Sequence, residues 1–155
     1  MTKVAWNYAA TDPEGAAAWA TEYNQQPGGN KVIDVVGGTW ARRDPEAAID
    51  WLGSLDPSDG KSAGLDSAFS SWARRDAVAA GDFINKMPVS SDRDSAIGGY
   101  ATSIVSKAPG MAYQWIESVE DPAARERLFI RTSEILFHQN SGAVGDYLAS
   151  GGLSP

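Results

Sequence analysis

Few residues of this chain have a type and spacing that could support catalysis. His138 is the only histidine, and no nucleophile motif lies near it, so a Ser-His-Asp relay is not indicated. Asp92 and Asp94 flank an expected helix start, where acidic side chains stabilise the positive end of the helix dipole. The stretch 56–60, DPSDG, lacks the ligand spacing of a calcium loop, and no GxGxxG phosphate motif is present. We therefore expect no catalytic residue, no cofactor and no metal site.

The clearest candidates for a binding surface are acidic residues that recur in one register. Asp50, Asp82 and Asp146 occupy this register, and Gln114 fills the place between Asp82 and Asp146. On stacked helices they would form an acidic stripe that attracts a basic protein or peptide. Ordinary solvent-exposed helix faces explain the same pattern, and both interpretations stay open.

Met111 and Tyr113 form a second candidate surface. They stand where the corresponding positions elsewhere in the chain carry mostly smaller residues, such as glycine and alanine. Surplus apolar side chains at such positions could anchor a partner. They could equally fill a gap left by small neighbours.

Composition narrows the class of partner. The chain has 155 residues, 43% of them hydrophobic, and a net charge of −7. This charge argues against nucleic acid, which proteins bind by neutralising phosphates, and against an anionic membrane surface. No apolar run approaches the roughly 20 residues that span a bilayer. The chain has no cysteine, so it has no disulfide and no thiolate chemistry.

These candidate residues belong to a repeating pattern with a period of 32 positions. Aromatic side chains fill the first column of this repeat: Trp19, Trp51, Phe83, Trp115 and Tyr147. Small residues fill the second: Ala16, Ala48, Ala80, Ala112 and Val144. Large apolar residues fill the third: Tyr8, Trp40, Trp72, Ile104 and Leu136. We expect the aromatic column to be buried, Trp51 included, because large apolar residues at helical spacing usually face the core.

Each repeat is expected to form two helices. Asp-Pro pairs such as Asp44-Pro45 supply a side-chain cap and a first helical residue, and the apolar spacing that follows is helical. The first helix of each repeat is predicted near 13–23, 45–54, 77–86, 109–119 and 141–149. The second is predicted near 31–42, 61–74, 93–106 and 124–138. Arg42-Arg43 and Arg74-Arg75 then end a helix, where cations favour the negative end of its dipole.

The Asp-Pro unit followed by an aromatic residue resembles the junction between tetratricopeptide repeats. Asp12-Pro13 with Trp19, and Asp44-Pro45 with Trp51, show that spacing. The period differs from that of tetratricopeptide repeats, and the Leu-Gly pair after the tryptophan is missing or displaced. The chain is also similar to tandem Trp and Asp-Pro helical repeats of uncharacterised bacterial proteins. The resemblance implies an architecture and a general binding role, and it assigns no functional residue.

We predict an all-α fold: a right- or left-curving α-solenoid of about five antiparallel helix-hairpin repeats, forming one domain over 1–155. The expected function is a non-catalytic scaffold for protein–protein interaction. One alternative is an accessory helical region of a larger enzyme, and another is an α/α toroid that binds carbohydrate or lipid. The apolar residues Val4, Trp6 and Tyr8, and Val144, Tyr147 and Leu148, suggest an excerpt of a longer array or self-association through the terminal helices.

Overall fold

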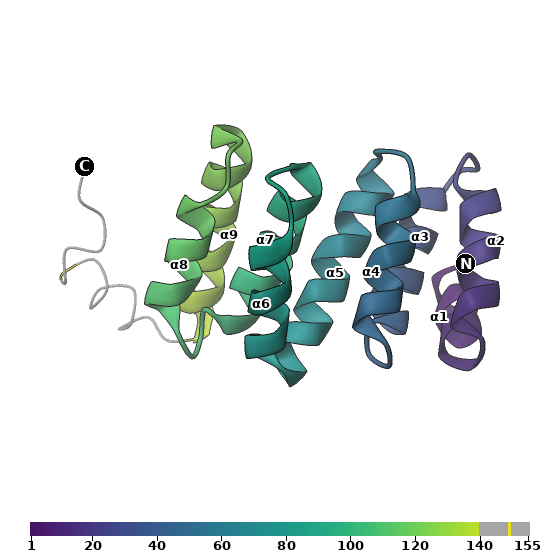
Figure 1. Cartoon of the computed structure of the whole chain (residues 1–155), viewed down its shortest axis with the longest axis horizontal. Coiled ribbons are helices and arrows are strands. Elements are labelled where there is room, and N and C mark those ends of the chain that lie inside the picture. The colour runs from purple at the N-terminus through teal and green to yellow at the C-terminus, as the bar shows by residue number, and fades with distance from the viewer. Residues whose placement is uncertain (140–148, 150–155) are drawn as a thin grey trace.

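The computed structural model describes residues 1–139 and 149, and these contain α-helices and no strand (Figure 1). The helices are α1 (Thr2–Thr11), α2 (Pro13–Tyr23), α3 (Gly29–Trp40), α4 (Pro45–Ser54), α5 (Asp59–Arg75), α6 (Ala77–Lys86), α7 (Ser91–Ile104), α8 (Pro109–Glu117) and α9 (Pro122–Gln139). The all-α prediction is confirmed for this part of the chain. The helix expected at 141–149, with Val144, Tyr147 and Leu148, lies outside the described residues apart from position 149.

Helix starts follow the local capping chemistry. The Asp44 carboxylate accepts a hydrogen bond from the Ala47 backbone N–H at 3.0 Å, and Pro45 is the first residue of α4. Asp12 and Asp76 cap α2 and α6 in the same way. Ala108 provides no side-chain cap to α8. The predicted starts of these four helices are confirmed.

The odd-numbered and even-numbered helices pack in two different ways. The odd-numbered helices pack in succession, each of them on the next, and each even-numbered helix packs between two of them. In Figure 1 the helices form a row that runs from α1 and α2 at one end, through α5, to α8 and α9 at the other. Leu52 shows how tightly the elements fit, because its side chain from α4 lies against Gly37 of α3 and Gly64 of α5.

The core is built from the small and large apolar columns. Ala16, Ala48, Ala80 and Ala112 are fully buried, as the sequence suggested. The third column is also buried from Trp40 onward, with Trp72 at 5% exposure. The aromatic column is shallower than expected: Trp19, Trp51, Phe83 and Trp115 are only partly buried.

The prediction that Trp51 is buried was therefore wrong. Its ring packs on Trp40 with centroids 6.1 Å apart, and its indole Nε1 donates a hydrogen bond to Thr21 Oγ1 at 3.2 Å. An indole N–H needs a polar partner. Because that partner is an exposed threonine of α2, the ring stays at the edge of the core.

The arginines after the odd-numbered helices do more than complement the dipole of their own helix. Arg43 donates from Nη1 to the Ala10 carbonyl at the end of α1, at 3.1 Å. Arg75 donates in the same way to the carbonyl of Arg42, just beyond α3. Each arginine thus satisfies a carbonyl at the end of the preceding odd-numbered helix, which such an end otherwise leaves unpaired.

Helix α1 exposes apolar side chains that have buried counterparts elsewhere. Val4 is 59% exposed, and Trp6 and Tyr8 are exposed as well. The residues 32 positions after Val4 and Tyr8, which are Val36 and Trp40, are buried. In α3 those positions are covered on both sides, by α1 and by α5.

Candidate binding groove

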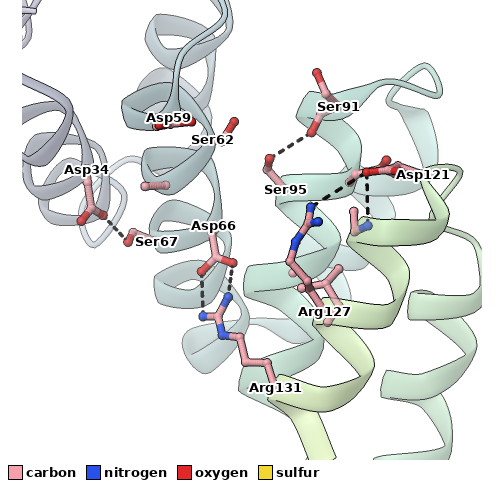
Figure 2. A pocket seen from close by; sticks show the side chains of 15 residues that line it. Asp34, Asp59, Ser62, Asp66, Ser67, Ser91, Ser95, Asp121, Arg127 and Arg131 are labelled. Atoms are coloured by element: carbon pink, nitrogen blue, oxygen red, sulfur yellow. Dashed lines mark hydrogen bonds and ion pairs between the residues drawn. The ribbon is translucent and has the colours of Figure 1, made fainter.

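A groove of about 720 Å³ runs across α3, α5, α7 and α9. Figure 2 shows Asp66 of α5 and Arg131 of α9 pointing toward each other, and Asp34 of α3 pointing toward Ser67 of α5. A second hollow, of about 390 Å³, adjoins it toward α1 and includes Trp6 in its wall. Both hollows are lined by Asp34, Asp66, Ser67 and Arg131, so they form one continuous depression.

Acidic and hydroxyl side chains dominate the wall of the larger hollow. Its charged residues are Asp34, Asp59, Asp66, Asp94, Asp121, Arg127 and Arg131. Its hydroxyl residues are Ser62, Ser67, Ser91 and Ser95. Carboxylates thus outnumber guanidinium groups there, and the concave shape focuses their field on whatever enters.

Helix α5 positions the largest share of this wall. Asp59, Ser62, Asp66 and Ser70 recur every three or four residues, which places them on one face of the helix. The opposite face carries Leu65, Ala68, Phe69 and Trp72, which are all buried. The apolar face therefore fixes the direction in which the polar face points.

Three of the five carboxylates have partners within the protein. Asp34 pairs with Lys31 Nζ at 2.5 Å and accepts a hydrogen bond from Ser67 Oγ. Asp66 accepts two hydrogen bonds from the Arg131 guanidinium, at 2.7 and 3.1 Å. Asp121 caps the start of α9 and lies 3.9 Å from Arg127. The hydrogen bonds that Arg131 donates to Asp66 raise the pKa of Arg131, so the guanidinium stays protonated.

The side chains of the other two carboxylates have no hydrogen-bond or ion-pair partner within the described residues. Within the described residues, Asp59 makes no hydrogen bond or ion pair, and it is exposed at the start of α5. The Oδ1 atom of Asp94 is buried and has no hydrogen-bond partner there. A buried, unpaired carboxylate oxygen is costly, and a donor from a bound partner would remove that cost.

The acidic stripe predicted from the sequence lies elsewhere. Asp50 and Asp82 are exposed on α4 and α6, and neither lines the groove. Asp146 lies outside the described residues. The groove therefore lies on the odd-numbered helices, while a separate hollow of about 250 Å³ is lined by Asn85 of α6 and Gln114 of α8.

Met111 and Tyr113 have different surroundings, although they were predicted as one surface. Met111 is 51% exposed on α8, as a partner anchor would require. Tyr113 is 3% exposed: its hydroxyl is hydrogen bonded to Ser133 Oγ at 2.9 Å, and its ring packs on Phe129 of α9. The second interpretation, filling a gap between small neighbours, describes Tyr113, and its place in a surface anchor was wrong.

Tyr100 links two of the predicted residues. Its hydroxyl lies 3.9 Å from Met111 Sδ, and burial together with the charge of Asp82 raises its pKa. The ring stacks edge-on against Trp115, with centroids 5.3 Å apart. Tyr100 therefore stays neutral in its packed position, where it supports α8 against α7.

Particular residues and helices of the chain bear on catalysis, metal binding and membrane insertion. His138 is exposed in the last turn of α9. Among the residues that the structure describes, no three His, Cys, Asp or Glu side chains are grouped to hold a metal ion. None of the helices described here combines the length and apolar character needed to cross a membrane.

Sequence reasoning missed the groove residues, although one signal was present. Asp34 and Asp66 are 32 residues apart, and each has mainly apolar or small residues beside it in the sequence. Gly98 lies a further 32 residues along the chain. Polar residues at such a spacing, with a glycine after them, indicate a helix face that is not packed in the core. Arg131 gives no such signal, because its partner Asp66 is 65 residues away.

Comparison with known proteins finds no significant match for this chain among protein-family models, curated proteins or solved structures.

Proposed function

We propose that this chain is a non-catalytic helical-repeat scaffold that binds an extended, basic segment of a partner protein in the groove across α3, α5, α7 and α9. The observation that carries the proposal is the acidic groove itself, with Asp59 and Asp94 unpaired in its wall. Lysine and arginine side chains are the protein groups that complement such a wall.

The repeat character of the scaffold is supported by contacts at a constant separation. Hydrogen bonds join Ser67 to Asp34, Ser71 to the Gly38 carbonyl and Ser103 to Ser70, each pair 33 residues apart. The fully buried alanine column recurs at the period of the sequence repeat. Such contacts between successive units are how a solenoid forms a long, continuous surface.

The dimensions of the groove suit an extended segment. Packed helices lie roughly 8–10 Å apart, while a segment in the extended polyproline II conformation rises about 3.1 Å per residue and has three residues per turn. Every third residue of such a segment would therefore point to the same side and meet the next helix. A segment of roughly eight to ten residues, with a basic side chain at every third position, would reach from α3 to α9.

A direct binding measurement tests this proposal. A fluorescent ten-residue peptide with arginine at every third position and neutral polar residues elsewhere is titrated with the protein, and its anisotropy is followed. We expect saturable binding that weakens as salt is added, because the contacts are between charges. A peptide of the same length with glutamate in place of arginine should not bind.

Two double variants locate the binding surface. Asp59→Asn with Asp94→Asn removes the unpaired groove carboxylates, while Asp50→Asn with Asp82→Asn makes the same charge change on α4 and α6. The groove variant should lose most of the affinity and the stripe variant should keep it. If the stripe variant loses affinity instead, the partner binds on the even-numbered helices and the proposed site is wrong.

A further inference from the structure

The Asp66–Arg131 pair spans two helices that are not neighbours. Asp66 lies on α5 and Arg131 on α9, and α7 packs between these helices. The carboxylate of Asp66 lies over α7 at Gly98, where a Cβ atom would be 2.8 Å from Asp66 Oδ2. The absence of a side chain at Gly98 leaves the carboxylate of Asp66 open to a guanidinium that comes from across the groove.

Arg131 divides the depression where its two hollows meet. The larger and the smaller hollow share four lining residues, and Asp66 and Arg131 are two of them. Figure 2 shows Arg131 extending from α9 to Asp66, with the guanidinium plane facing both carboxylate oxygens. A segment that runs the length of the groove must therefore meet this pair.

The pair has the geometry of arginine recognition. Two guanidinium nitrogens, Nη1 and Nη2, each donate to a different oxygen of Asp66, at 2.7 and 3.1 Å. A planar guanidinium supplies this parallel pair of donors, whereas a lysine ammonium acts as a single point charge. Asp66 is thus already placed to hold an arginine in preference to a lysine.

Arg131 is accessible enough to be replaced. Its side chain is 48% exposed and that of Asp66 is 21% exposed. Ion pairs with this much solvent contact are weakly held, since water competes for both charges. An incoming guanidinium could make the same two hydrogen bonds to Asp66 while Arg131 turns into solvent.

We propose that Asp66 is an arginine-selective subsite of the groove and that Arg131 is its internal occupant, which a partner's arginine displaces on binding. This inference rests on the proposed function, because it names the side chain that the groove selects. It predicts that the groove prefers arginine-bearing segments, and that Arg131 lowers their affinity by competing with them.

The test uses two peptides and a matched pair of variants. One ten-residue peptide carries arginine at every third position, and the other carries lysine at the same positions. Arg131→Gln frees Asp66, whereas Arg127→Gln removes the same charge from α9, one turn earlier and in the same groove wall. The comparison separates competition at Asp66 from the general change in groove charge.

We expect the wild-type protein to bind the arginine peptide more tightly than the lysine peptide. Arg131→Gln should raise affinity for the arginine peptide about two- to fivefold beyond the change caused by Arg127→Gln, the range expected for release of an exposed ion pair. Asp66→Asn should remove the preference for arginine. Arg131→Lys keeps the positive charge but cannot donate the two parallel hydrogen bonds of a guanidinium. Its affinity for the arginine peptide should therefore lie between those of the wild type and Arg131→Gln.

The outcomes distinguish this inference from the proposed function. If both peptides bind but Arg131→Gln and Arg127→Gln behave alike, or Asp66→Asn keeps the arginine preference, the subsite is wrong and the groove proposal stands. If neither peptide binds the wild type or any variant, both proposals fail. Circular dichroism melts show whether each variant is folded, and Arg131→Lys supplies the comparison if Arg131→Gln is not.

Discussion

Gly99 of α7 packs directly on the backbone of Asp66 in α5. A Cβ atom on Gly99 would lie 1.9 Å from the Asp66 carbonyl oxygen, a separation that no rearrangement of a side chain can relieve. This contact sets how closely the two helices approach, and so it also sets the width of the groove wall that carries Asp66 and Asp94.

Gly99→Ala should therefore destabilise the protein. Forcing the helices apart costs about 1–3 kcal/mol of unfolding free energy, the usual cost of overpacking. Gly53→Ala is the control, because Gly53 lies in α4 and a methyl group added there would have no neighbouring atom within 4 Å. That change should leave stability equal or raise it by up to about 1 kcal/mol. Urea denaturation of both variants measures the difference, and equal midpoints would contradict the close packing of α5 and α7.

The aromatic column and the third column differ in burial, so replacing a tryptophan in each should change the free energy of unfolding by different amounts. Trp72 is buried, so Trp72→Ala should cost about 3–5 kcal/mol through the cavity it leaves. Trp51 is only partly buried, so Trp51→Ala should cost clearly less. Thermal unfolding followed by circular dichroism compares the two. A larger loss for Trp51→Ala would show that the aromatic column, and not the third column, carries the core.

The pKa of Tyr100 gives a pH-dependent prediction. Burial and the charge of Asp82 favour the neutral phenol, so the folded-state pKa lies above the ordinary value of 10.0. The stability that this contributes is complete below pH 10 and is lost as pH rises through the folded-state pKa. Wild type should therefore lose stability above pH 10 more steeply than Tyr100→Phe.

Asp82→Asn tests the cause of that shift. Removing the carboxylate should lower the folded-state pKa of Tyr100 toward its ordinary value, while burial continues to hold it up. Difference absorption of the phenolate, measured against Tyr100→Phe to subtract the other tyrosines, reports this pKa. An unchanged titration would mean that Asp82 does not influence the hydroxyl.

Local chemistry explains why the helix ends were predictable and the depth of the aromatic column was not. Asp44 caps α4 through a residue three positions away, so sequence alone contains both partners. Trp51 depends on Thr21, which is 30 residues earlier and on another helix. Helical periodicity identifies a side chain that faces its neighbours, but it does not show whether a polar partner holds the ring at the edge of the core.

The candidate site was less predictable for the same physical reason. The sequence indicated that acidic residues in register could form a binding surface, but it pointed to Asp50 and Asp82. The groove depends on which face of α5 is covered, and on the path that Gly98 leaves open to Arg131. Both features depend on how α5, α7 and α9 pack together, so the apolar pattern of any one helix does not predict them.

Lys61 and Asp92 provide the last prediction, because they form an ion pair in which the lysine side chain is only 8% exposed. Lys61 Nζ lies 2.9 Å from Asp92 Oδ2 and donates to the Gly53 carbonyl at 3.3 Å, which ties the end of α4 and the starts of α5 and α7 together. Asp92→Asn leaves this buried ammonium without its countercharge, and should cost about 1–2 kcal/mol of unfolding free energy.

Asp94→Asn is the matched control for that change. Asp92 and Asp94 both lie in the first turn of α7, so either substitution removes one favourable interaction with the helix dipole. Asp94 has no ion-pair partner within the described residues, and its buried Oδ1 is unpaired, so neutralising it also relieves a desolvation cost. Asp92→Asn should therefore lower the urea midpoint more than Asp94→Asn at neutral pH. Equal midpoints at neutral pH would show that the Lys61–Asp92 ion pair contributes nothing beyond the interaction of Asp92 with the helix dipole.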